Sequence, residues 1–406
     1  MILIMPRRMM RITGAAAAGL GALAVLSALA TLGAEGSAAG AAGTQPRGVR
    51  LPVATAYVAN ARSDTVTPIN TLTGARGPAI VVRGGPAQVA VTPDGTTAYV
   101  ASQSQGLVTP IDTLTDVAGP AIKVGTDSEF VAITPDGRTA YAASAGPGTV
   151  TPIDTATGAL GTPIPVTAGP DFIALTPDGR TAYVASAPSF TAPGSVTPID
   201  TATGTAGRPI KVGVEPVDIA ITPDGARAYV VNSLSGTVTP IDTATNTAGP
   251  PIRVGGNPCQ VAITPDGRTA YVTNGKRTGS VTPIRTSTGR LGKAIDAGEF
   301  SCEIAITPDG RTAYVSAFTG TSPGGLTGIV TPVRLPSGRP GTPVTLGRLT
   351  GATDIAITPD GTTAYVVALK KLPRMPGIVV PISTLTGTPG RVIRVGDEPL
   401  SIAFTP

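Results

Sequence analysis

The chain of 406 residues contains no histidine, no tryptophan and only two cysteines. Without histidine, the sequence excludes Ser-His-Asp and Cys-His nucleophile systems, HExxH zinc sites and acid–base catalysis by imidazole. Without tryptophan, no indole ring can stack on a quinone cofactor. Aromatic residues make up 3% of the chain, which argues against base stacking and hence against nucleic-acid binding. Charged residues make up 14%, so the chain has enough uncharged surface to build a large core.

The N-terminal segment is the part of the sequence that differs most from the rest. Arg7, Arg8 and Arg11 are followed by a run of alanine, glycine and leucine over residues 12–34, and then by small residues that include Ala39-Gly40-Ala41. A charged start, an apolar stretch and a small-residue cleavage pattern are typical of a secretory signal. An uncleaved membrane anchor is the alternative, since about twenty apolar residues can span a bilayer.

We therefore expect a signal peptide over residues 1–42, a linker over residues 43–53 and export to the cell envelope or beyond. The pair Arg7-Arg8 also leaves the twin-arginine route open. Cleavage removes three arginines and one glutamate, so the net charge falls from +5 to +3. That small charge gives no reason to expect a nucleic-acid partner, and no membrane contact is expected beyond the signal segment.

The rest of the sequence is an internal repeat. Each unit contains four short segments rich in Val, Ile, Thr and Tyr, for example residues 97–100, 108–111, 121–124 and 131–134. Turn residues bound each segment, which indicates strands. Four strands in each unit of about 44 residues predict an all-β propeller. Every tyrosine of the chain occupies the same position of the repeat: Tyr57, Tyr99, Tyr141, Tyr183, Tyr229, Tyr271, Tyr314 and Tyr365.

The turns and the chain ends predict how the ring closes. Thr-Pro-Asp-Gly occurs seven times, and each occurrence predicts a tight hairpin because Pro presets φ and Gly accepts a left-handed conformation. The last unit stops at Thr405-Pro406, and the first begins at Ala54 without a preceding strand. Residues 402–405 should therefore pair with the first hairpin and close a ring of eight blades over residues 54–406, with seven blades as the alternative.

These motifs give the chain a family resemblance. Tyr271-Val272-Thr273-Asn274, with variants starting at Tyr57 and Tyr229, resembles the signature of the YVTN-type β-propeller repeat family. The Thr-Pro-Asp-Gly turns and Thr-Val-Thr-Pro-Ile-Asp strands are similar to that family as well. The resemblance implies an exported or surface propeller, often of seven blades, and it implies no single activity.

The candidate binding site is the mouth of the central channel. Eleven of the aspartates recur in turns, so we interpret them as structural. The residues that directly precede the innermost strands differ most between units, with polar and acidic groups on one arc and two phenylalanines on the other. We predict a cation, amine or sugar site here, centred on Asp218, Glu303 and Asp354, with solvated rim charge as the alternative. The ring consists of Gln88, Phe130, Phe172, Asp218, Gln260, Glu303, Asp354 and Ser401.

Two further features should lie near this mouth. Cys259 and Cys302 occupy equivalent positions of consecutive units, so a disulfide is expected in an oxidising compartment, with free thiols or a soft-metal pair as alternatives. The loops between second and third strands should share this face, and four are expanded, at residues 187–194, 275–279, 318–328 and 369–377. Basic residues in two of these loops could orient a polyanionic or zwitterionic partner or could serve solubility alone: Lys276, Arg277, Lys370, Lys371 and Arg374.

The sequence predicts the function less closely than it predicts the fold. The sequence favours a monomeric, non-catalytic propeller that binds a protein or glycan of the cell envelope. The alternative is a propeller enzyme of the lactonase, lyase or quinoprotein-like kind that uses acidic residues at the mouth, and a purely structural role is the third. No cofactor is expected, although mouth carboxylates could coordinate Ca²⁺; the identity of any metal stays open.

Overall fold

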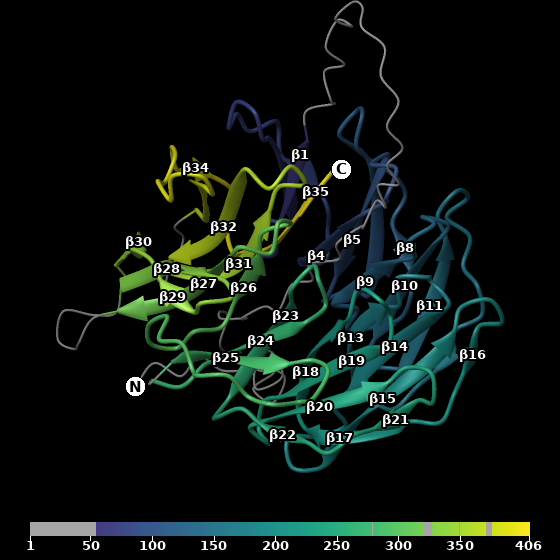
Figure 1. The fold of residues 1–406 in the computed structure, drawn as a ribbon. Helices are drawn as coiled ribbons and strands as arrows, with labels where there is room; N and C mark the ends of the chain where they lie inside the picture. The colour runs from purple at the N-terminus through teal and green to yellow at the C-terminus, as the bar shows by residue number, and fades with distance from the viewer. Residues whose placement is uncertain (1–53, 278, 320–326, 349, 371–375) are drawn as a thin grey trace, which may run out of the picture.

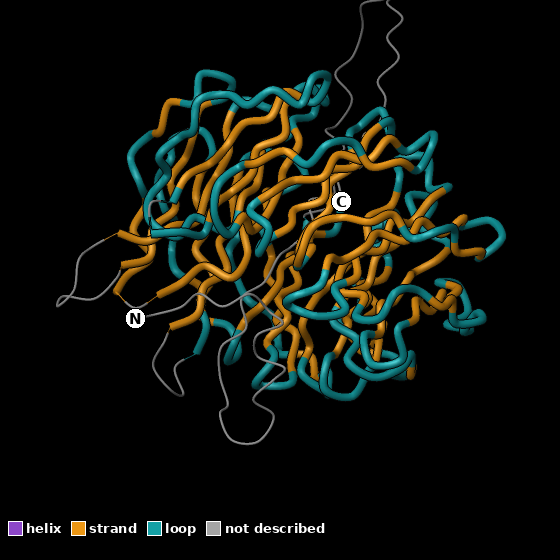
Figure 2. Tube along the Cα trace, turned by 90° about the horizontal axis from the view of Figure 1, so that it is seen from below, coloured by secondary structure: helices purple, strands orange, loops and turns teal. Residues whose placement is uncertain are grey.

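A computed structural model describes residues 54–277, 279–319, 327–348, 350–370 and 376–406. The regular structure of these residues consists of strands, which form eight sheets in a ring (Figures 1 and 2). The prediction of eight blades is confirmed, and the alternative of seven is wrong. The predicted signal peptide and linker lie outside the described residues. Within the described residues, no helix is long and apolar enough to cross a membrane.

Blades are numbered here from the one that contains both chain ends. The innermost strands of blades 1 to 8 are β35 (Pro399–Phe404), β4 (Pro86–Val91), β9 (Phe130–Ile133), β13 (Pro170–Leu175), β18 (Pro216–Ile221), β23 (Pro258–Ile263), β26 (Ile304–Ile306) and β31 (Thr350–Ile357). The second strands are β1 (Thr55–Asn60), β5 (Thr97–Ser102), β10 (Thr139–Ser144), β14 (Thr181–Ser186), β19 (Arg227–Asn232), β24 (Thr269–Asn274), β27 (Thr312–Thr319) and β32 (Thr363–Lys370). The third strands are β2 (Thr65–Asn70), β6 (Leu107–Asp112), β11 (Thr149–Asp154), β15 (Pro193–Asp200), β20 (Thr237–Asp242), β25 (Ser280–Arg285), β28 (Thr327–Arg334) and β33 (Ile378–Ser383).

The outer edge of each blade is less regular, and in several blades it is split into two short strands that pair with the same third strand. In blade 6 it is reduced to two isolated bridges, Val281 with Ile295 and Ile284 with Leu291. The outer strands are β3 (Ile80–Val81), β7 (Val117–Ala118), β8 (Ile122–Lys123), β12 (Ile164–Pro165), β16 (Thr205–Ala206), β17 (Ile210–Val214), β21 (Thr247–Ala248), β22 (Ile252–Arg253), β29 (Arg339–Pro340), β30 (Val344–Arg348) and β34 (Ile393–Arg394).

The two ends of the chain close the ring. Strand β35 pairs antiparallel with β1, with Phe404 opposite Ala56 and Ile402 opposite Val58 (Figure 1). The Thr405 amide continues the ladder by donating to the Thr55 carbonyl oxygen at 2.9 Å. The predicted closure by residues 402–405 is therefore confirmed, and it leaves no open edge at the centre of blade 1.

The repeated tyrosines are buried, and six of them donate a hydrogen bond to the following blade. All eight are at most 2% exposed. The hydroxyl of Tyr229 donates to the Thr286 carbonyl oxygen in the following blade at 2.8 Å, and Tyr99 bonds Thr155 in the same way at 2.9 Å. Burial raises the pKa of these phenols, that of Tyr183 to about 12, so the hydroxyls stay protonated and can donate. Each such ring therefore fills the space between two sheets, and its hydroxyl group is hydrogen-bonded.

The Thr-Pro-Asp-Gly turns form one face of the ring, which we call the turn face. In the first of them, the Thr92 hydroxyl donates to the Asp94 carboxylate at 2.5 Å, and the Thr96 amide donates to the same oxygen at 3.0 Å. Gly95 has φ of 72°, as the turn requires. The other six turns repeat the Thr-to-Asp bond at 2.5–2.6 Å. These turns are structural, and they look alike in every blade that has one.

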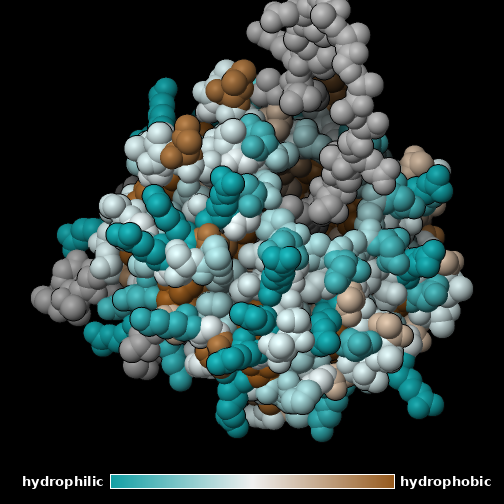
Figure 3. Space-filling view, in the orientation of Figure 1, coloured by the Kyte–Doolittle hydropathy of each residue, from teal (hydrophilic) through white to brown (hydrophobic). Residues whose placement is uncertain are grey.

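The opposite face, which we call the loop face, carries two kinds of connection. One joins the second and third strands of a blade, and the other leads from an outer strand into the next innermost strand. They lie together because the first donates a backbone hydrogen bond to the second, as from Ser233 to Glu215 at 2.8 Å and from Gly275 to Asn257 at 2.8 Å. Hydrophilic residues are spread over the visible side of the molecule, and hydrophobic residues form small separate patches (Figure 3). The predicted sharing of one face by these connections is confirmed.

Candidate functional site

The eight residues predicted for the channel mouth do form one layer around the centre. The innermost strands contact one another in a closed circuit, from β4 through β31 to β35 and back to β4. We expected the eight residues just before these strands, but seven lie within them, and Glu303 alone directly precedes its strand. In most blades a β-bulge shifts the register just before the ring residue, as between Pro216 and Asp218. A bulge re-aims the side chain that follows it, which brings these residues into one layer.

The polar residues of this layer are buried rather than exposed as rim charge; all eight members are at most 5% exposed. Five of them accept a hydrogen bond from a backbone amide of the following blade. Because a buried amide without a partner costs about 1–3 kcal/mol, each of these bonds helps to hold two blades in register. The bonds run from Val131 to Gln88 (2.8 Å), Val261 to Asp218 (2.8 Å), Ile304 to Gln260 (2.6 Å), Ile402 to Asp354 (2.7 Å) and Val89 to Ser401 (3.4 Å).

The aromatic arc of the layer packs on itself. The rings of Phe130 and Phe172, from blades 3 and 4, have centroids 4.4 Å apart and are at most 1% exposed. Glu303 lies in blade 7, between the two aspartates of blades 5 and 8, and is 3% exposed. The polar and aromatic arcs predicted from the sequence are thus present, and the polar arc serves contacts between blades. Ligand binding by Asp218, Glu303 and Asp354 stays a prediction.

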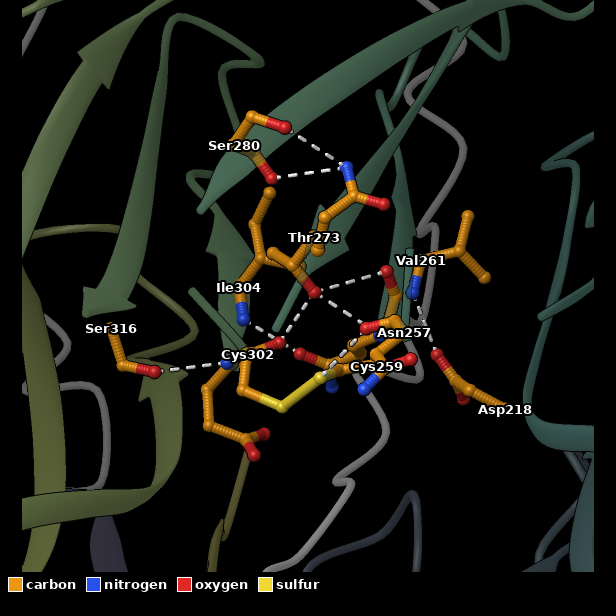
Figure 4. Close-up of a disulfide and its surroundings, with 12 residues drawn as sticks. Asp218, Asn257, Cys259, Val261, Thr273, Ser280, Cys302, Ile304 and Ser316 are labelled. Carbon is orange, nitrogen blue, oxygen red and sulfur yellow. Dashed lines mark hydrogen bonds between the residues drawn. A yellow bond between two sulfur atoms is a disulfide. The ribbon is translucent and has the colours of Figure 1, made fainter. Parts of the chain in front are cut away.

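The two cysteines are joined in a disulfide that links blades 6 and 7 (Figure 4). Their Cα atoms are 5.2 Å apart, inside the limit of about 7 Å for a disulfide. Cys259 occupies the bulge of β23, one residue before Gln260. The hydroxyl of Thr273, from the YVTN motif, donates to the Cys302 carbonyl oxygen at 2.5 Å. Covalent and hydrogen-bonded links therefore meet at the same point of the loop face.

A second candidate site, which the sequence did not reveal, is a groove on the loop face between blades 5 and 6. It has a volume of about 390 Å³. The sequence predicts Lys276 as part of a basic loop and Arg253 as outer-strand charge that blocks pairing with other sheets, but it does not bring the two together. A comparison of equivalent positions between units could have found the groove, because it combines two cations with neutral residues where several other units carry an acid. The lining consists of Ser233, Leu234, Ser235, Gly236, Arg253, Gly255, Gly256, Asn257 and Lys276.

In the described part of the chain, no group of three or more His, Cys, Asp or Glu residues is placed to hold a metal ion. Glu129, near the aromatic arc, accepts a hydrogen bond from the Gln103 amide. The predicted basic residues Lys371 and Arg374 lie outside the described residues.

No protein-family model and no curated protein matches this chain. Among solved structures, the fold is similar to that of the dihydro-heme d1 dehydrogenase NirN in complex with DHE (18% identity, 89% of this chain and 77% of that chain, TM-score 0.70). It is similar to Kuenenia stuttgartiensis hydrazine synthase (23% identity, 77% of this chain and 96% of that chain, TM-score 0.56). A functionally unknown protein from Desulfotomaculum acetoxidans also matches (18% identity, 86% and 98% coverage, TM-score 0.60). At these identities the likeness concerns the fold alone, which is an eight-bladed β-propeller.

Proposed function

We propose that this chain is an exported propeller of the YVTN type that binds a component of the cell envelope through its loop face. The observation that carries the proposal is the contrast between the two faces. The turn face repeats one hydrogen-bonded motif around the ring, whereas the loop face differs from blade to blade in length, charge and shape. Variable loops on a rigid scaffold are where binding residues are found in propellers and in other repeat folds.

The acids at the centre serve the contact between blades. The Asp218 and Asp354 carboxylates each accept a hydrogen bond from a buried backbone amide of the next blade. These side chains therefore contribute to a rigid platform, and a rigid platform lowers the entropic cost of presenting a binding surface.

Crosslinking from each face tests this proposal. Ser104 on the loop face and Thr96 on the turn face belong to the same blade and are both exposed, so they form a matched pair. A photoreactive residue at either position is introduced into the full chain, which is then illuminated with isolated envelope. We expect adducts from position 104 and none from position 96. Equal adducts from both positions, or none from either, would overturn binding through the loop face.

Export needs its own test. Residues 1–53 are fused to a reporter that is active only outside the cytoplasm, and a second fusion carries Arg7→Gln, Arg8→Gln and Arg11→Gln. We expect reporter activity from the first fusion and its loss in the second, because the positive start of a signal sets its insertion. A reporter that stays inside the cell in both fusions would contradict an envelope role.

A further inference from the structure

The groove between blades 5 and 6 is strongly polar and one-sided in charge. Residues 233–236 of blade 5 form one wall, the connection at residues 255–257 forms the floor, and Lys276 of blade 6 stands opposite. Arg253 and Lys276 are both exposed. None of the described residues that line the groove is an aspartate or a glutamate. Two cations that face one groove without a lining acid create a positive potential that attracts anions.

The chain itself contains a matched region that lacks this property. Where blade 8 leads into blade 1, Arg394 and Arg62 occupy the positions of Arg253 and Lys276. There the floor carries two acids, and Arg62 forms an ion pair with Glu398 at 3.5 Å. The acids Asp397 and Glu398 stand where the groove has Gly256 and Asn257. Equivalent cations thus face an acidic floor at one junction, where Arg62 is paired, and a neutral floor at the other.

The groove cation Lys276 is held in place by its surroundings. A Cβ atom on Gly256 would lie 1.5 Å from the Lys276 Cε atom, so the lysine side chain lies directly across this glycine. The Lys276 carbonyl oxygen accepts a hydrogen bond from the Phe300 amide at 2.9 Å. A Cβ atom on the preceding Gly275 would lie 2.9 Å from the Cys259 sulfur, so the disulfide packs against the same loop. These contacts hold the backbone from which the lysine side chain reaches the groove floor.

We propose that this groove binds the anionic group of a charged glycan. The two cations would bind a carboxylate or a phosphate, and the arginine can do so with two parallel hydrogen bonds. The hydroxyls of Ser233 and Ser235 and the amide of Asn257 can donate to and accept from sugar hydroxyls. Leu234 is the only large hydrophobic residue of the lining, which leaves little for the apolar side chains of a peptide. The volume of about 390 Å³ falls in the range of small-ligand sites.

Titration calorimetry on the purified full chain, with four hexameric probes, tests whether the groove binds a charged glycan. The probes are oligogalacturonate, a phosphorylated maltohexaose, unmodified maltohexaose and oligoglutamate. We expect one or both charged glycans to bind, and binding to weaken as salt rises, because screening reduces the attraction. Binding of the galacturonate alone or the phosphate alone identifies the source of the charge. Equal binding of neutral maltohexaose, or tighter binding of oligoglutamate, would overturn the proposal.

Variants locate the binding. Arg253→Gln with Lys276→Gln should weaken binding of the charged glycan about tenfold or more, since both charge-assisted hydrogen bonds to the anion are lost. Asn257→Glu should do the same by adding an acid to the floor. Its backbone φ of 52° is one that Glu398 already adopts at 55°. The matched control, Arg62→Gln with Arg394→Gln, should leave binding unchanged.

Equal weakening in the control pair would overturn the assignment to this groove. If the double variant fails to fold, as its melting curve would show, Asn257→Glu and the salt series on the unmodified chain still test the proposal.

This inference specifies a ligand for the loop face and so rests on the proposed binding role. Adducts from position 104 without glycan binding would overturn the inference alone. Glycan binding without adducts would count against capture of an envelope component through blade 2.

Discussion

The junction between blades 5 and 6 and the junction between blades 8 and 1 are alike inside. At the first, Asp218 accepts from the Val261 amide at 2.8 Å. At the second, Asp354 accepts from the Ile402 amide at 2.7 Å. The tyrosines Tyr229 and Tyr365 likewise donate to a threonine carbonyl oxygen of the next blade, at 2.8 and 3.1 Å. The second junction, which we call the closing junction, leads from β34 into β35, the strand that closes the ring by pairing with β1, and it uses the same contacts as the first.

On the surface the same two junctions differ in charge. Arg62 is paired with Glu398 at the closing junction, whereas Lys276 faces Gly256 and Asn257 at the other. Substitutions in the interior should break the contacts between blades, whereas substitutions of the exposed side chains at these two junctions should change the surface charge. The comparison therefore separates residues that hold the ring together from residues that are available for binding. The predictions below test that separation, starting with the largest effect.

Acid should weaken the turn face of the whole ring, including the blades on both sides of each junction, because the pKa values of all seven turn aspartates are shifted in the same direction. The hydrogen bond from the Thr222 hydroxyl lowers the pKa of Asp224, and the other turn aspartates have lowered pKa values as well. A carboxyl with a lowered folded-state pKa contributes stability above its unfolded pKa of about 3.9, and this contribution is lost as pH falls through the folded value. We expect the urea midpoint to fall steadily below about pH 4. A constant midpoint from pH 6 to 2 would contradict this, and Thr222→Val should reduce the fall.

Loss of the disulfide should have the next largest effect. Cys259→Ala with Cys302→Ala opens a loop of 43 residues and should lower the free energy of unfolding by about 2–4 kcal/mol. Because Gly275 packs against Cys259, the variant should also weaken glycan binding in the neighbouring groove. Urea unfolding and titration measure the two effects. A stability change below about 0.5 kcal/mol would show that the hydrogen bonds of blades 6 and 7 suffice.

Removal of a ring acceptor should affect the two junctions similarly. Asp218→Ala and Asp354→Ala each leave a buried amide without this acceptor, at a cost of about 1–3 kcal/mol. Hydrogen exchange should speed up at the Val261 amide in the first variant and at the Ile402 amide in the second. Asp→Asn at either position keeps a carbonyl oxygen in place and should cost less. If Asp→Ala and Asp→Asn were equally harmful at both sites, charge and not the backbone bond would be the relevant property.

The sequence predicts the fold more completely than the site, for physical reasons. Strand number and ring closure depend on the spacing of tyrosines and turns, which the chain shows directly. The ring residues can also be selected from the sequence, because they stand at one position of the repeat. Their burial and their bonds to the next blade depend on the bulge at positions such as Val217, which a strand pattern does not reveal. The groove depends on Arg253, Gly256 and Lys276 from three segments, so only the folded chain brings it together.

The smallest effect is expected for the surface ion pair. Arg62 and Glu398 are 39% and 23% exposed, and pairs of this kind contribute less than about 1 kcal/mol to stability. A double-mutant cycle with Arg62→Gln and Glu398→Gln, followed by urea unfolding, should therefore give a coupling energy below that value. The converse change, Asn257→Glu, should give a similarly small coupling energy with Lys276, although it should weaken glycan binding. A coupling of about 2 kcal/mol or more at the closing junction would show that surface charge helps to close the ring, and the separation drawn between interior and surface would then fail there.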